Sequence, residues 1–167
     1  MTSRISVLEL AWRVREGARL SRWARQTRRE YLDFVVDGVS LRDAVCDVDA
    51  GTVAGDLIGC LGWGSNKAYE DGLVDQLMLE KPSELETGRR LLYVCPECGD
   101  VGCGAVTAIV EEEAGCFVWK EFGYEVNYRY DEDDALFDLA GYEGIGPFRF
   151  DKRQYRDTLI NRPKSRS

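Results

Sequence analysis

Apolar and polar positions follow two different periods along the chain, which indicates that strands and helices are mixed. Continuous or alternating runs of β-branched and aromatic residues, bounded by Gly-containing turns, predict strands. These runs cover residues 31–36, 56–63, 91–94, 105–113, 116–122, 124–130 and 148–150. Because short turns such as Ala114-Gly115 join neighbouring runs, we expect an antiparallel meander.

Helices are predicted where a capping residue precedes a segment with helical apolar spacing. Ser40 is expected to cap a short helix over 41–45, and Ser65 or Asn66 a helix over 67–79. Asp151 is expected to cap a final helix. The inner face of that helix is expected to hold Tyr155, Leu159 and Ile160. A further, peripheral helix over 5–29 is predicted from the spacing of Val7, Leu8, Ala11, Trp12, Val14 and Leu20. The fold class is therefore α+β: an antiparallel sheet flanked by a few helices.

Charge divides the chain into an acidic body and two basic ends. Residues 1–30 contain eight Arg and three Glu, a net charge of +5. Residues 31–151 carry −18, and residues 152–167 carry +5, which gives −8 in total. We therefore expect a basic N-terminal helix or extension over 1–30, a single α+β domain over 31–162, and a disordered tail over 163–167.

The composition also bounds the surroundings and partners of the protein. The chain has no apolar run of about 18 residues and no signal-peptide pattern, so a cytoplasmic protein without membrane contact is expected. An acidic body repels nucleic-acid phosphates and attracts basic surfaces. We therefore expect a basic protein partner and no direct nucleic-acid contact by the body. The oligomeric state stays open.

The strongest local pattern is a cluster of thiols at Cys95, Cys98 and Cys103. Clustered cysteines in a reducing compartment usually indicate metal binding or reactivity, and the chain has no His. A Cys-Pro-x-Cys-Gly turn suits zinc, with Cys103 as a third ligand. Cys116 is a possible fourth ligand, but a regular nine-residue strand of roughly 30 Å would separate it from the turn.

Other assignments for the cluster stay open. The fourth ligand could instead be Cys46, Cys60 or the carboxylate of Asp100. The turn could also be a hairpin without metal in which Cys95 or Cys98 pairs reversibly with Cys103. An iron–sulfur or catalytic redox role is the remaining alternative, although redox CxxC sites normally lie at a helix N-terminus.

The sequence around the thiols resembles a family of small uncharacterised actinobacterial proteins. Four segments carry the resemblance: 92–107, which includes the run YVCPECGDVGCGAVT, and also 31–38, 119–125 and 146–151. The resemblance implies a fold unit that begins near residue 31 and leaves residues 1–30 outside. Family members are sometimes labelled oxidoreductases, but the chain has no cofactor motif that supports this label.

Common catalytic machinery is missing from the sequence. Without His, a Ser-His-Asp triad and a Cys-His dyad are excluded, and no Gly-rich phosphate-binding motif occurs. An enzyme that uses carboxylates alone has no specific support. We therefore expect a non-enzymatic protein-binding module, most concretely an immunity-type inhibitor of a basic bacterial toxin or nuclease. The alternative is a thiol-based redox or zinc-binding protein that uses the Cys cluster. The expected partner-binding residues are Glu111, Glu112, Glu113, Trp119, Tyr128, Asp131, Glu132, Asp133 and Asp134.

Overall fold

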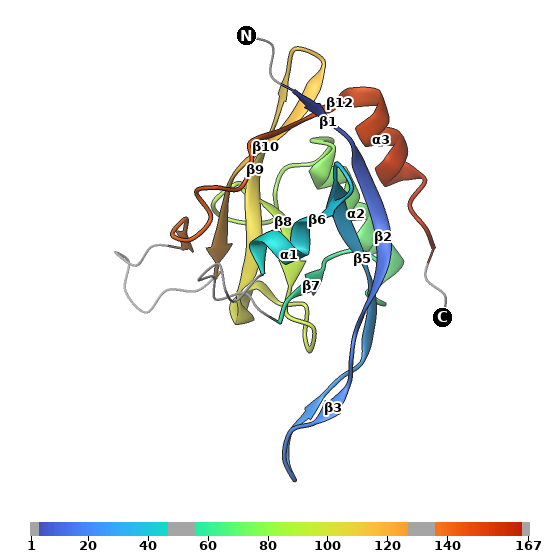
Figure 1. The fold of residues 1–167 in the computed structure, drawn as a ribbon, viewed down its shortest axis with the longest axis vertical. Helices are drawn as coiled ribbons and strands as arrows, with labels where there is room; N and C mark the ends of the chain where they lie inside the picture. Colours follow the sequence, from blue (N-terminus) through green and yellow to red (C-terminus); the bar gives the residue numbers. More distant parts are fainter. Residues whose placement is uncertain (1–3, 47–55, 127–135, 165–167) are drawn as a thin grey trace.

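The computed structural model describes residues 4–46, 56–126 and 136–164. A seven-stranded sheet and a three-stranded sheet pack around a shared core, and three α-helices lie among the described residues (Figure 1). The α+β fold class is therefore confirmed. No helix of the described residues is long and apolar enough to cross a membrane.

The seven-stranded sheet contains the predicted meander. Its strand order is β1 (Ile5–Ser6), β12 (Phe148–Asp151), β10 (Cys116–Glu125), β9 (Ala105–Glu113), β8 (Arg90–Val94), β7 (Ile58–Gly59), and β11 (Phe137–Asp138) pairs separately with β10. Strands β7 to β10 are antiparallel neighbours in chain order, whereas β1 pairs in parallel with β12. The turn between β9 and β10 has positive φ at both Ala114 and Gly115, as tight hairpin turns require.

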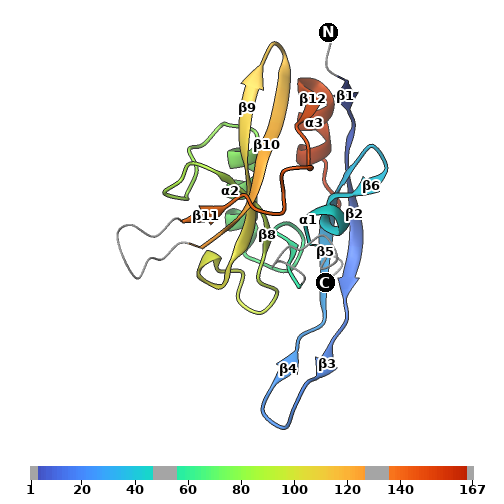
Figure 2. The same ribbon diagram turned by 60° about the vertical axis from the view of Figure 1, so that its left-hand side comes forward.

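The N-terminal segment forms strands, so the predicted helix over 5–29 is wrong. Strand β2 (Leu8–Arg15) pairs with β5 (Arg29–Val36), which also pairs with β6 (Val39–Ser40). The short strands β3 (Ala18–Arg19) and β4 (Arg25–Gln26) continue this hairpin beyond the body (Figure 2). Apolar residues alternate along β2, and this period of two, which suits a half-buried strand, competes with the helical spacing. The boundary predicted at residue 31 falls inside β5.

The predicted helix caps are confirmed. Side chains of Ser40, Asn66 and Asp151 accept backbone N–H groups at the starts of α1 (Leu41–Val45), α2 (Lys67–Leu77) and α3 (Lys152–Ile160). On α3, Tyr155 and Leu159 are buried as expected, but Ile160 is exposed. The apolar faces that the sequence indicated therefore attach α2 and α3 to the core.

The strand predicted over 56–63 is shorter in the structure. Its chain passes from β8 to Leu32 of the other sheet, and Gly59 allows the two backbones to lie close together. A Cβ atom on Gly59 would lie 2.0 Å from the carbonyl oxygen of Leu32. Leu61 then forms an isolated bridge with Leu32 of β5. The close backbone approach expected at the glycines of this segment is confirmed, but it leaves only Ile58–Gly59 as regular strand.

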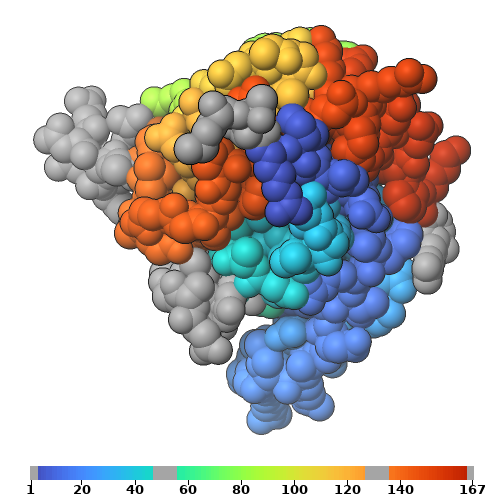
Figure 3. All heavy atoms as spheres, turned by 45° about the horizontal axis from the view of Figure 1, so that its top comes forward, coloured from blue at the N-terminus to red at the C-terminus, as the bar shows by residue number. Residues whose placement is uncertain are grey.

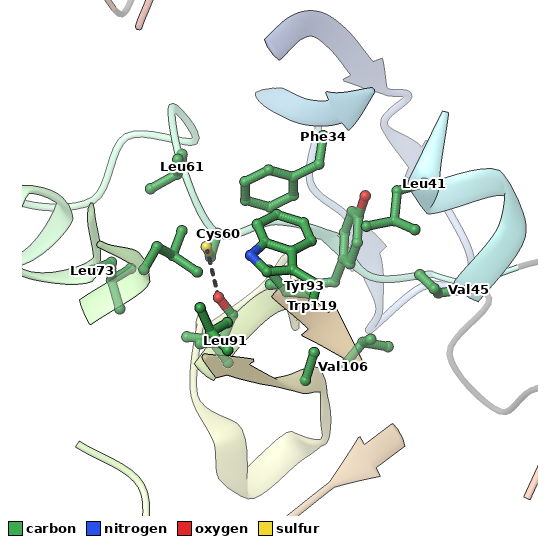
Figure 4. Close-up of a cluster of buried hydrophobic side chains, with 14 of the residues drawn as sticks. Phe34, Leu41, Val45, Cys60, Leu61, Leu73, Leu91, Tyr93, Val106 and Trp119 are labelled. Carbon is green, nitrogen blue, oxygen red and sulfur yellow. Dashed lines mark hydrogen bonds between the residues drawn. The ribbon is translucent and has the colours of Figure 1, made fainter. Parts of the chain in front are cut away.

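An aromatic cluster fills the space between the sheets (Figure 4). The ring of Trp119 contacts Phe34 edge-on, at 5.4 Å between centroids. Its indole N–H donates to the hydroxyl of Tyr155 at 3.0 Å, and this hydroxyl donates to the carbonyl of Leu77. Trp119 is completely buried, so its predicted role in partner binding is wrong. It joins β10 to α3 and α2 instead.

A buried carboxylate connects the two sheets beside this cluster. Asp33 of β5 is fully buried and accepts hydrogen bonds from the hydroxyls of Tyr93 at 2.7 Å and Ser40 at 2.5 Å. The guanidinium of Arg13 lies 3.2 Å from the same carboxylate. Asp33 therefore has two hydroxyl donors and one cation as partners. Such partners offset the cost of burying a carboxylate.

Replacing Tyr93 by Phe is expected to lower the free energy of unfolding by about 1–3 kcal/mol, because Asp33 then loses a buried donor. Urea denaturation followed by circular dichroism measures this change. The matched control is Tyr69→Phe, since the exposed Tyr69 donates to Glu84 at 2.9 Å. The control is expected to change stability by less than about 0.5 kcal/mol. Equal losses in both variants would contradict this account.

Candidate metal centre

Three thiols meet in the connection between β8 and β9. Cys95 directly follows β8, Cys98 lies in the following turn, and Cys103 ends a 3₁₀ helix, η2 (Val101–Cys103), that leads into β9. All three sulfur atoms lie within 4.8 Å of one another, and those of Cys98 and Cys103 are 3.2 Å apart. The structure therefore brings together the three cysteines that the sequence selected.

Backbone groups and one obligatory glycine shape the turn. The N–H of Gly99 donates to the carbonyl of Cys95 at 2.8 Å, and the N–H of Asp100 points at the sulfur of Cys98 at 3.4 Å. Gly99 has φ +68, and a Cβ atom there would lie 2.6 Å from the ring of Trp63. Only glycine can adopt this conformation against the indole without displacing it.

The N-terminal hairpin holds the turn from outside. Glu97 accepts hydrogen bonds from Arg15 at 2.6 Å and from the hydroxyl and backbone N–H of Thr27 at 2.7 and 2.9 Å. Arg29 donates to the carbonyl of Pro96 at 2.9 Å. The bonds from Arg15 and Thr27 lower the pKa of Glu97 to about 2, so the carboxylate stays charged over the whole neutral range. The sequence offered no sign of this contact, because the partners are 67 to 82 residues apart.

The three thiols are not equivalent. Burial opposes ionisation of Cys98, but bonds from the Asp100 N–H and from the thiols of Cys103 and Cys95 outweigh it and lower the pKa of Cys98. The bond to Cys98 and the nearby sulfurs raise the pKa of Cys103 to about 12. Of these two thiols, Cys98 therefore ionises more readily than Cys103. Thiolate is the form that binds metals and attacks disulfides.

The remaining cysteines lie elsewhere. Cys46 and Cys60 are buried core residues, and burial raises the pKa of both thiols. Cys116 lies opposite Glu113 at the far end of the β9–β10 hairpin, so it is excluded as the fourth ligand of the turn. Asp100 uses one carboxylate oxygen to accept the N–H of Gly102 at 3.0 Å. Within the part of the chain that the structure describes, the cluster consists of three donors.

The acidic residues of the predicted contact surface that the structure describes form ion pairs within the molecule. On the exposed end of β9, three carboxylates contact three basic residues: Glu111 with Lys120 at 2.9 Å, Glu112 with Lys152 at 2.5 Å, and Glu113 with Arg149 at 3.2 Å. The remaining predicted contacts, Tyr128, Asp131, Glu132, Asp133 and Asp134, lie outside the described residues. Because these ion pairs neutralise the β9 end, the predicted inhibitor role now depends mainly on the undescribed segment.

Sequence reasoning missed a buried ion pair in the main sheet. Arg89 and Glu125 are 3% and 1% exposed, and their side chains approach to 3.6 Å. Hydroxyls of Thr87 and Thr107 donate to Glu125, while Arg89 donates to Thr107 and to the carbonyl of Glu121. Burial raises the pKa of Glu125 and lowers that of Arg89. No pattern in the sequence marks this pair.

No protein-family model, curated protein or solved structure matches the chain. The resemblance to an actinobacterial family therefore stays a prediction. The arrangement of the side chains is what supports a function for this protein.

Proposed function

We propose that the chain is a zinc-binding protein in which Cys95, Cys98 and Cys103 hold one zinc ion. The observation that carries this proposal is the meeting of three thiols within 4.8 Å. A tetrahedral zinc ion with bonds of about 2.3 Å places its sulfur ligands about 3.8 Å apart. The 3.2 Å between the sulfurs of Cys98 and Cys103 and the 4.8 Å limit for all three lie on either side of this value, so small side-chain rotations would let the three sulfurs bind one ion.

The surroundings of the thiols suit a metal with a mainly structural role. The turn is held by Glu97 and by the carbonyl of Pro96, both of which contact the N-terminal hairpin. An ion between β8 and β9 would fix the same turn from inside, and cross-linking a turn stabilises the folded state. Cys98 and Cys103 are exposed, so the fourth position would face solvent. A fourth ligand from a partner would close the site, as a structural zinc requires.

Protein purified under reducing, anaerobic conditions is expected to contain about one zinc ion per chain by elemental analysis. Cys98→Ser and Cys103→Ser are expected to lose this zinc on dialysis, because a hydroxyl does not replace a thiolate ligand. Cys116→Ser is the matched control and is expected to keep it, since Cys116 lies at the other end of the β9–β10 hairpin. Zinc retained in Cys98→Ser, or lost equally in the control, would contradict the proposal.

A reversible disulfide is the second candidate, and the 3.2 Å separation of the Cys98 and Cys103 sulfurs favours it. A disulfide bond is about 2.05 Å long, so a modest rotation would join them. Two thiols would lose two hydrogen atoms to a low-molecular-weight disulfide, which is reduced to two thiols. Intact mass after exposure to oxidised glutathione tests this. A metal-free protein that loses two hydrogens would replace zinc binding with redox chemistry as the function.

A further inference from the structure

The β3–β4 hairpin projects from the body as a separate arm. Strands β2 and β5 pair along eight consecutive residue pairs within the fold, and β3 and β4 extend them into solvent (Figures 1 and 2). In the space-filling view the blue atoms of this arm protrude below the rest of the molecule (Figure 3). Its tip therefore offers side chains to a partner on more than one side.

Internal hydrogen bonds give the tip of the arm a defined shape. The hydroxyl of Ser21 accepts the backbone N–H groups of Trp23 and Ala24, and the N–H of Leu20 donates to the carbonyl of Ala24. Closer to the body, the side chain of Gln26 donates to the carbonyl of Glu16 at 2.8 Å. The arm is thus a hydrogen-bonded hairpin with a defined backbone at its tip.

Two arginines face each other across this hairpin. Arg19 and Arg25 are directly paired in the antiparallel register, which places their side chains on the same face. Like charges in this position destabilise a strand pair. Among the described residues Arg28 contacts Glu30 at 3.2 Å, whereas no ion pair joins Arg19, Arg22 or Arg25 to a carboxylate. An anionic ligand would remove this repulsion.

Exposed apolar side chains lie beside these charges at the tip. Trp23 is 88% exposed and Leu20 is 64% exposed, the highest and third-highest values among the exposed large apolar residues of the described chain. The guanidinium of Arg22 lies 5.4 Å from the centre of the Trp23 ring. An exposed indole among unpaired arginines is suited to a ligand that is both anionic and aromatic, because bases stack on the ring while phosphates contact the guanidinium groups.

We propose that the β3–β4 hairpin binds single-stranded nucleic acid. Arg19, Arg22 and Arg25 contact phosphates, and Trp23 stacks on an unpaired base. A duplex buries its bases in the stack, so a single strand fits an exposed ring better. The acidic body repels phosphates and confines contact to the arm. This inference is independent of the zinc proposal, since none of the arm residues belongs to the thiol cluster.

Fluorescence anisotropy with a labelled single-stranded oligo(dT) tests the proposal. The wild-type protein is expected to bind with an affinity that falls as salt rises, with a log–log slope of about −2 for three phosphate contacts. Trp23→Ala is expected to weaken binding about tenfold, because one stacked base is lost. Arg19→Glu/Arg25→Glu is expected to abolish measurable binding. The charge-matched control, Arg153→Glu/Lys164→Glu, alters exposed residues away from the arm and is expected to bind like wild type.

Several results would overturn the proposal. The wild-type protein could fail to bind oligo(dT), or the control variant could lose as much affinity as the arm variants. The protein could also prefer a duplex of the same length, or polyglutamate could compete as strongly as unlabelled oligo(dT). The last result would assign the arm to acidic protein surfaces instead. Circular dichroism checks that each variant is folded. Zinc content, measured on the same samples, shows whether a loss of oligonucleotide binding is accompanied by loss of the metal.

Discussion

Replacing Glu125 by Ala is expected to lower the free energy of unfolding by about 3–5 kcal/mol, because it leaves the buried Arg89 without its counter-charge. The hydroxyls of Thr87 and Thr107 lose their acceptor in the same step. Urea denaturation followed by circular dichroism measures the change. A loss below about 1 kcal/mol would show that Arg89 finds another partner or reaches solvent.

Two further variants separate the charge pair from general effects of carboxylate removal. Glu111→Ala breaks the exposed pair with Lys120 and is expected to change stability by less than about 1 kcal/mol. The double variant Arg89→Met/Glu125→Leu removes both buried charges. It is expected to be more stable than Glu125→Ala, because a buried pair replaced by apolar side chains leaves no uncompensated charge.

The same pair makes stability depend on pH in a defined direction. Burial raises the pKa of Glu125 above its ordinary value of 4.5, and the nearby threonines and Arg89 only partly offset this. The part of the stability that is linked to this titration is therefore complete below pH 4.5 and is lost as the pH rises through the folded-state pKa. The ionised carboxylate still keeps its contacts with Arg89, Thr87 and Thr107 at neutral pH. As the pH rises above 4.5, the free energy of unfolding of the wild type is accordingly expected to fall relative to that of Glu125→Gln.

Local patterns predicted most of the sheet and all three described helices. Caps such as Ser40 and Asn66 act within three residues, and the turn at Ala114-Gly115 joins neighbouring strands, so each can be recognised in the sequence. The thiol cluster was found for the same reason, since its members lie within nine residues. Features of this kind depend on spacing alone.

The errors came from features that depend on distant partners. The apolar residues of β2 fit both a helix and a strand, and pairing with β5 decided between them. Burial of Trp119 depends on contacts with Phe34 and Tyr155, far away in the chain. The pair of Arg89 with Glu125 is likewise set by the register of three strands. Single-sequence periodicity contains no information on such contacts.

Gly104→Ala is expected to lower the free energy of unfolding by about 3–5 kcal/mol and to disturb the thiol cluster. Gly104 follows Cys103 and has φ +95, a conformation that strains any residue with a side chain. A Cβ atom there would also lie 1.7 Å from the hydroxyl oxygen of Tyr124. Backbone strain and overpacking each cost about 1–3 kcal/mol, so their combined effect is large.

The two contributions can be separated by matched variants. Gly88→Ala has a similar positive φ of +77 but no atom within 4 Å of the new Cβ, so it is expected to cost only about 1–2 kcal/mol. In a Tyr124→Ala background the clash disappears, and Gly104→Ala is expected to cost about as much as Gly88→Ala. An unchanged cost in that background would assign the whole effect to the backbone. If zinc content also falls in Gly104→Ala but not in Gly88→Ala, the close contact between Gly104 and Tyr124 is what keeps Cys103 in place for the metal.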